Sequence, residues 1–96
     1  MQVKEAVSLA RRYVQEIFAD EKIDSISLEE VEYDEKSQIW SITIGFSRPW
    51  EGAPGTVAAQ FAAAGMMPRR RDYKVVRLSD TDKKMLSVKN RELVGD

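Results

Sequence analysis

Three consecutive arginines, Arg69, Arg70 and Arg71, are the residues best suited to binding chemistry in this sequence. They begin a segment, residues 69–91, that carries nine basic and three acidic side chains, a net charge of +6. Tyr73 follows the run closely. Guanidinium groups contact phosphates and an aromatic ring stacks on bases, so this segment is a candidate nucleic-acid surface. A domain that binds nucleic acid through one patch is usually more basic than this chain, whose net charge is -1.

The acidic residues 29–35 allow two interpretations. Paired carboxylates can perform acid–base catalysis or hold magnesium, but no glycine-rich phosphate-binding loop accompanies them here. Carboxylates along a strand are more typical of a solvated sheet edge, and these are also the expected partners of the arginine run. The segment Asp80-Thr81-Asp82 lacks the glycine and the distant glutamate of a calcium loop. We therefore predict a turn there.

The chain contains no histidine and no cysteine. Their absence excludes triads of the Ser-His and Cys-His kinds, disulfides and thiolate metal sites. We therefore expect a protein that is not an enzyme and that needs no cofactor or metal.

A second candidate binding surface is apolar. Trp50 lies in a segment flanked by Pro49 and Gly52. An aromatic side chain in such a loop can anchor an interface at low entropic cost. Phe61, Met66 and Met67 follow, and methionine adapts to varied partners. Either these side chains fold back onto the core, or they form an arm that binds a partner. The second alternative makes them candidate partner-binding residues, together with the arginine run.

These candidates must be positioned by a helix and four strands. Apolar residues recur at helical spacing over residues 2–20, which predicts an amphipathic helix. Residues 26–33 resemble a strand, and residues 38–46 alternate clearly between apolar and polar side chains. Residues 73–78 and 85–91 predict a second hairpin.

The first strand has an imperfect alternation. Ile26 and Leu28 share one parity, whereas Val31 and Tyr33 share the other. One extra residue near Glu29-Glu30 would place all four on one face, so the pattern predicts a β-bulge.

Residues 47–72 form a long connection between the two predicted hairpins. A short helix can begin at a capping Thr56, continue through Ala64 and end at Gly65. Alternatively, the alanine- and glycine-rich segment is a mobile arm. We expect partial order, with a short helix and loose flanks.

One helix followed by two hairpins predicts a single α+β domain over residues 1–96, with the helix packed on a four-stranded antiparallel sheet. In the third strand Tyr73 and Val75 oppose Val76 and Leu78 in parity, which leaves open which pair faces the helix. The second face of the sheet is then expected to be polar and to carry Ser41, Thr43, Lys74, Ser87 and Lys89. Leu86 and Val88 are expected to share a face of the fourth strand.

The near-neutral chain conceals a division of charge, because residues 1–47 have a net charge of -5 and residues 48–96 a net charge of +4. No targeting or membrane-spanning segment is visible: charged residues interrupt the start of the chain, and the longest uncharged run, residues 52–68, is broken by glycine and proline. We expect a cytoplasmic protein without a membrane partner.

The chain resembles the PepSY-like and cystatin-like group of small domains. The helix over residues 3–18, the strand over residues 39–44 and the closing segment over residues 73–88 carry this resemblance. In PepSY-like domains a Tyr-x-Val strand commonly leads through an Asp-containing turn to a last apolar strand. Here Lys83 or Lys84 stands where that turn usually has glycine. The resemblance implies the same fold and a protein-binding or inhibitory role, and it supplies no catalytic residue.

Two functions follow as hypotheses. The first is a non-catalytic protein-interaction module of the inhibitor, immunity or adaptor kind, which binds through residues 47–72 and the adjoining sheet face. The alternative is a nucleic-acid-associated protein that uses the basic hairpin, residues 69–91. The edges of a four-stranded sheet also leave homodimerisation by strand addition open.

Overall fold

The computed structural model describes residues 1–49 and 69–91. The chain begins with an α-helix, α1 (Val3–Ile17), and a short 3-10 helix, η1 (Ala19–Glu21). The helix forms because Ala6, Ala10 and Val14 recur every four residues and are fully buried against the sheet. Lys22 ends the helical segment in the left-handed region, with φ 52°. The predicted helix is confirmed, and its α-helical part is shorter than residues 2–20.

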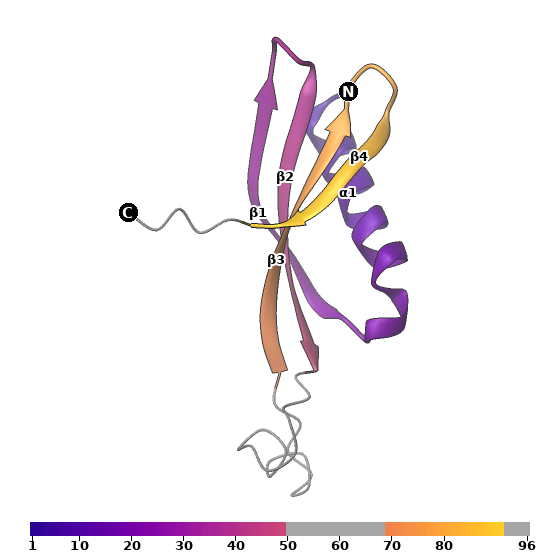
Figure 1. Ribbon diagram of the computed structural model, residues 1–96, viewed down its shortest axis with the longest axis vertical. Helices are drawn as coiled ribbons and strands as arrows, with labels where there is room; N and C mark the ends of the chain where they lie inside the picture. The colour runs from indigo at the N-terminus through magenta and orange to yellow at the C-terminus, as the bar shows by residue number, and fades with distance from the viewer. Residues whose placement is uncertain (50–68, 92–96) are drawn as a thin grey trace, which may run out of the picture.

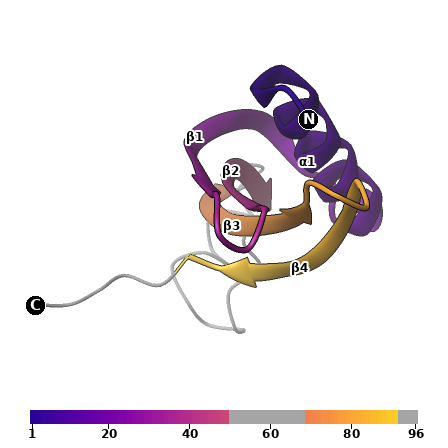
Figure 2. The same cartoon turned by 90° about the horizontal axis from the view of Figure 1, so that it is seen from above.

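Four antiparallel strands follow in one sheet of order β1-β2-β3-β4 (Figure 1). Their bounds are β1 (Asp24–Asp34), β2 (Ile39–Pro49), β3 (Arg69–Ser79) and β4 (Lys84–Asn90). Figure 2 shows α1 on one side of this sheet, with β1 and β4 at its two edges. The predicted α+β architecture is therefore confirmed.

The two hairpins are closed by turns of the same form. The Gln38 N–H donates to the Asp34 carbonyl at 2.8 Å, and the Lys83 N–H donates to the Ser79 carbonyl at 2.8 Å. Gln38 and Lys83 have positive φ values of 57° and 53°, so each takes the position where a glycine would be unstrained. The turn predicted around Asp80 is thereby confirmed.

The predicted β-bulge in β1 is also confirmed. Leu28 pairs with Ile44 and Glu30 pairs with Thr43, which leaves Glu29 as the extra residue. A second irregularity lies between Asp24 and Ser27. The first bulge brings the apolar residues of β1 that precede and follow it to the helix side of the sheet.

The strands of the central pair are longer than predicted. β2 continues to Pro49 and β3 begins at Arg69, so residues 47–49 and 69–72 belong to the ladder and not to a loop. Polar residues can extend this ladder because Arg48 and Asp72 form an ion pair on it. The connection is thus reduced to residues 50–68. The helix predicted over residues 56–64 lies outside the described residues.

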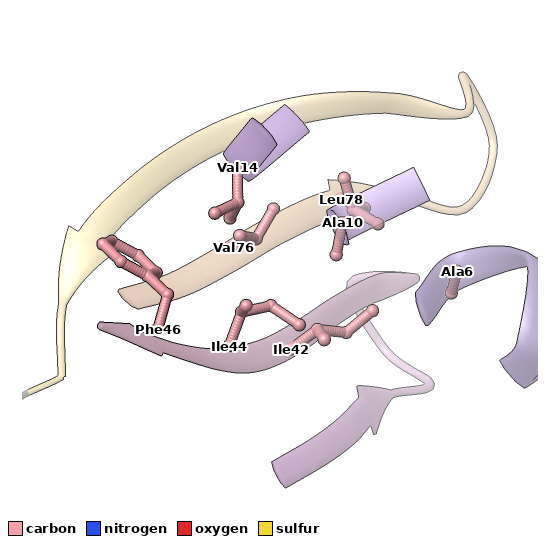
Figure 3. Packing of buried hydrophobic residues seen from close by; sticks show 8 residues of the cluster. All are labelled: Ala6, Ala10, Val14, Ile42, Ile44, Phe46, Val76 and Leu78. Carbon is pink, nitrogen blue, oxygen red and sulfur yellow. The ribbon is translucent and has the colours of Figure 1, made fainter. Parts of the chain in front are cut away.

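The core lies between α1 and the two central strands (Figure 3). Phe18 closes one end of it, because its ring lies 5.1 Å from the ring of Phe46. Every fully buried apolar side chain of the described chain belongs to this cluster: Ala6, Ala10 and Val14 of α1, Ile42, Ile44 and Phe46 of β2, and Val76 and Leu78 of β3.

The register corrects two expectations about which residues share a face. Lys74 pairs with Ile44 and lies on the helix side, where its Nζ is 5.6 Å from the centroid of the Phe18 ring. Leu86 does not pack with Val88: a register shift leaves Leu86 unpaired and 46% exposed, and Met85 packs against the core instead.

Candidate functional site

The sheet face opposite α1 is the candidate site, because α1 packs on the other face (Figure 2). Its edges are exposed, whereas Thr43 at its centre is only 3% exposed. Acidic side chains line its β1 edge, small polar side chains lie along β2, and basic side chains lie on β3 and β4. We call this surface the open face, formed by Ser27, Glu29, Glu30 and Glu32 of β1, Ser41, Thr43, Gly45 and Ser47 of β2, Arg71, Tyr73, Val75 and Arg77 of β3, and Ser87 and Lys89 of β4.

The arginine run is divided between the two faces of the sheet. Successive residues of a strand point to opposite sides, so Arg70 lies on the helix side and Arg71 on the open face. The Arg70 Nε lies 3.5 Å from Asp72 Oδ1. The side chain of Arg69 lies outside the described residues. The run therefore forms no continuous basic patch.

A second ion-pair group lies on the helix side of the sheet, at the C-terminal end of β2. The Arg48 Nε pairs with Asp72, and the Arg48 Nη1 donates to Glu21 Oε2 at 3.1 Å. Arg48 thus links the strand to the short helix η1, and its charge is compensated inside the fold.

Arg71 is occupied by the fold on the open face. Its Nη1 donates to the Ser25 carbonyl at 2.9 Å and to Ser47 Oγ at 3.2 Å, while its Nη2 donates to Ser27 Oγ. The same Nη2 lies 3.7 Å from Glu29 Oε1. Ser25 has a positive φ of 52° at the irregular start of β1. Arg71 therefore ties β3 to β1 across β2, and the expected pairing of the run with acidic residues of the first hairpin is met by this contact.

Tyr73 is enclosed between a glycine and an arginine. A Cβ placed on Gly45 would come within 3.1 Å of the Tyr73 ring, so the ring lies directly over the backbone of β2. The Arg91 guanidinium lies 4.2 Å from the centroid of the ring, which is the geometry of a cation–π contact. Base stacking would need a free ring face, and this ring is already covered.

Arg77 and Lys89 are the cations of the open face that form no close ion pair within residues 1–49 and 69–91, although Arg77 interacts electrostatically with the Asp34 carboxylate. Both are exposed, and neither forms an ion pair or a side-chain hydrogen bond with residues 1–49 or 69–91. They flank the half-buried Val75, which pairs with Lys89 on one side and Thr43 on the other. The carboxylates of Glu30 and Glu32 lie at the far ends of the same two rows.

Asp80 has a role that the sequence did not suggest. Its Oδ1 accepts hydrogen bonds from the Met1 amine at 2.6 Å and from Trp40 Nε1 at 3.0 Å. These two donors lower the pKa of Asp80. Burial, with Asp80 nearby, raises the pKa of Tyr33, whose ring lies 4.7 Å from that of Trp40. This cluster joins the start of the chain to the second turn and is structural.

The apolar candidates Trp50, Phe61, Met66 and Met67 lie outside the described residues. Within the described residues, no three carboxylates converge as a metal site, and no helix is long and apolar enough to cross a membrane. The site therefore consists of exposed charged side chains around a centre of small, buried residues, an arrangement suited to binding a complementary surface.

Comparisons with known proteins add no relative: no family model, no curated protein and no solved structure matches this chain.

Proposed function

We propose that this protein is a non-catalytic protein-interaction module, of the inhibitor, immunity or adaptor kind, that binds its partner through the open face. The observation that carries the proposal is the pair of exposed cations beside Val75, Arg77 and Lys89, which form no close ion pair or side-chain hydrogen bond with residues 1–49 or 69–91. An apolar residue at the centre of a contact, with polar and charged residues around it, is a common composition of protein interfaces.

The distribution of charge indicates what the partner presents. The β1 edge is acidic and the β3–β4 half is basic, two strand spacings or about 10 Å apart. A partner with carboxylates above Arg77 and Lys89, and with cations above Glu30 and Glu32, would dock in one orientation only. Such complementarity contributes mainly to specificity and association rate.

The connection between β2 and β3 is part of this proposal. It leaves the sheet after Pro49 and returns at Arg69. We propose that Trp50, Phe61, Met66 and Met67 supply the apolar anchors of the same interface.

Binding of nucleic acid is the weaker alternative. Arg70 and Arg71 are engaged by Asp72, Glu29 and backbone or serine oxygens. The Tyr73 ring is covered by Arg91. Few free cations and no free ring face favour a protein partner over a phosphate backbone.

Chemical cross-linking in cell extract, followed by binding to the purified candidate partner, tests the proposal. The double variant Arg77→Glu with Lys89→Glu is compared with the control variant Lys36→Glu, whose side chain lies in the first turn. We expect the double variant to weaken binding at least about tenfold, because two attractive contacts become repulsive. The control is expected to bind like the original chain.

Three results would overturn the proposal. They are equal binding by the double variant, a salt-dependent shift of a single-stranded oligonucleotide at low ionic strength, and a stable homodimer in solution that covers the open face.

A further inference from the structure

A mostly apolar groove lies on the other side of the molecule, between α1 and β1. Its volume is about 370 Å³, and its lining is formed by Val3, Lys4, Val7, Ser8, Arg11 and Leu28. Val3 is 48% exposed and Leu28 is 41% exposed, which is high for aliphatic side chains beside a core.

The groove exists because the apolar stripe of α1 is wider than the surface that the sheet covers. Ala6, Ala10 and Val14 occupy the buried centre of that stripe. Val3 and Val7 lie beside it, toward β1, where Leu28 comes just before the bulge at Glu29. The edge of the helix and the start of β1 thus share apolar surface that no other described element covers.

Two cations flank the apolar floor. Lys4 and Arg11 are seven residues apart on α1, which places them about 10 Å apart along the helix axis. Neither forms an ion pair with the described residues, whereas Glu5 of the same helix lies 3.8 Å from Lys83. The groove therefore combines an apolar floor with two uncompensated positive charges on one wall.

We propose that this groove binds an extended acidic segment of a partner protein, in which a side chain of leucine size lies between two carboxylates. In an extended chain, side chains two residues to either side of the central one point the same way, and the outer two lie about 13 Å apart. Lys4 and Arg11 can meet carboxylates at that spacing, because both side chains are long and flexible, while the central side chain enters between Val3, Val7 and Leu28.

A peptide fits this groove better than a small amphiphile. Small ligands bind in pockets that enclose 70–90% or more of their surface, and this groove is open along its length. An extended peptide obtains the remaining contacts outside the groove. The proposal does not depend on the open face, which β1 separates from this groove.

Titration of the isotope-labelled full chain with a short peptide, followed by NMR, tests this inference. The probe has the core Glu-Ser-Leu-Ser-Glu, and matched probes replace both glutamates by glutamine or the leucine by alanine. We expect shifts of the amides of Val3, Val7 and Leu28, with a dissociation constant on the order of 1 mM, as for a single short contact. Each replacement in the probe is expected to weaken binding several-fold.

Variants of the groove give the second arm of the test. Lys4→Glu with Arg11→Glu is expected to weaken binding at least about tenfold, and Lys4→Gln with Arg11→Gln to weaken it less. Arg12→Glu is the matched control, because Arg12 is exposed on the same helix and does not line the groove. Circular dichroism verifies that each variant keeps its helix.

The inference is overturned by any of four results: no shifts at saturating peptide, shifts confined to the open face, equal loss in the Arg12 variant, or tighter binding of dodecanoate than of peptide. Shifts at the groove with no partner on the open face would support this inference while contradicting the proposed function, so the two failures are distinguishable.

Discussion

Each end of the open face carries an arginine of β3, but the two arginines differ in how many contacts they make within the fold. Near the start of β3, Arg71 is held by a carbonyl, by two serine hydroxyls and by the nearby carboxylate of Glu29. Further along the same strand, Arg77 forms no hydrogen bond or close ion pair with the described residues and interacts only electrostatically with Asp34. Lys89, diagonally across from it on β4, forms no ion pair with them either. The arginine run has the highest density of positive charge, and its described arginines are engaged in ion pairs and hydrogen bonds within the fold.

The difference teaches that strand register decides which cations remain available. The bulged start of β1 brings Ser25, Ser27 and Glu29 within reach of Arg71. Arg77 pairs with Ser41 on β2 and with Ser87 on β4, whose short side chains carry no charge, and the Asp34 carboxylate acts on it only electrostatically. An arginine therefore stabilises the sheet at one position and stays free for a partner six residues later.

The largest loss of stability near Arg71 is expected from a side chain added at Gly45, on the strand between Arg71 and Glu29. In Gly45→Val the new Cβ would come within 2.9 Å of Glu29 Oε1 and 3.1 Å of the Tyr73 ring. We expect the free energy of unfolding to fall by about 2 kcal/mol, as in overpacked interiors. Urea denaturation measures it. Ser41→Val, two rows along the same face and partly exposed, is the control and should change stability far less; equal losses would contradict the proposed crowding.

Removing the charge of Arg71 should lower the free energy of unfolding by less than the Gly45 variant does. Arg71→Met keeps the apolar stem but leaves the Ser25 carbonyl and the Glu29 carboxylate without their donor. We expect a loss of about 1 kcal/mol, because the network is partly exposed. The melting temperature measures this loss, and Arg12→Met should leave it unchanged. An unchanged melting temperature in the Arg71 variant would show that the network contributes nothing.

The carboxylate of Asp80 should make a modest contribution to stability that depends on pH. Hydrogen bonds from the Met1 amine and Trp40 lower the pKa of Asp80 in the folded state. A lowered pKa contributes stability that is present above the unfolded-state value and is lost as the pH falls through the folded-state value. The stability difference between the original chain and Asp80→Asn should therefore be largest near neutral pH and shrink in acid. Urea midpoints from pH 7 to pH 3 measure it, and a difference independent of pH would contradict the assignment.

Substitutions of Arg77 and Lys89 should change the stability of the fold least. Arg77→Ala and Lys89→Ala remove exposed side chains that form no hydrogen bond or close ion pair with the described residues, Arg77 having only an electrostatic interaction with Asp34. We expect the free energy of unfolding to stay within about 0.5 kcal/mol of the original, as for ordinary surface positions. A larger loss in either variant would mean that these cations also belong to the fold, and the contrast with Arg71 would disappear.

Local patterns sufficed for the architecture. The helical spacing of Ala6, Ala10 and Val14 and the alternation of β2 each encode one element. The broken parity of β1 located the bulge at Glu29, because only one extra residue could bring its apolar side chains to a single face. These features depend on neighbours in the chain, which a sequence displays directly.

Long-range pairing could not be obtained in the same way. The arginine run resembled a loop end, so its division between two faces was missed until β3 was found to begin at Arg69. Lys74 was expected on the polar face, yet its long side chain lies beside Phe18 with the charge at the rim. The contact between Asp80 and Trp40 spans forty residues and leaves no local signal.

The equal turns and the long connection also set an order of assembly. Each hairpin closes over four residues, 35–38 or 80–83, whereas the central pair of strands must close over nineteen, residues 50–68. The entropy of closing the longer loop costs about 1.4 kcal/mol more than that of a four-residue loop. We therefore expect the two hairpins to form as separate local units, and their pairing at Ile42, Ile44 and Val76 to limit the rate of folding.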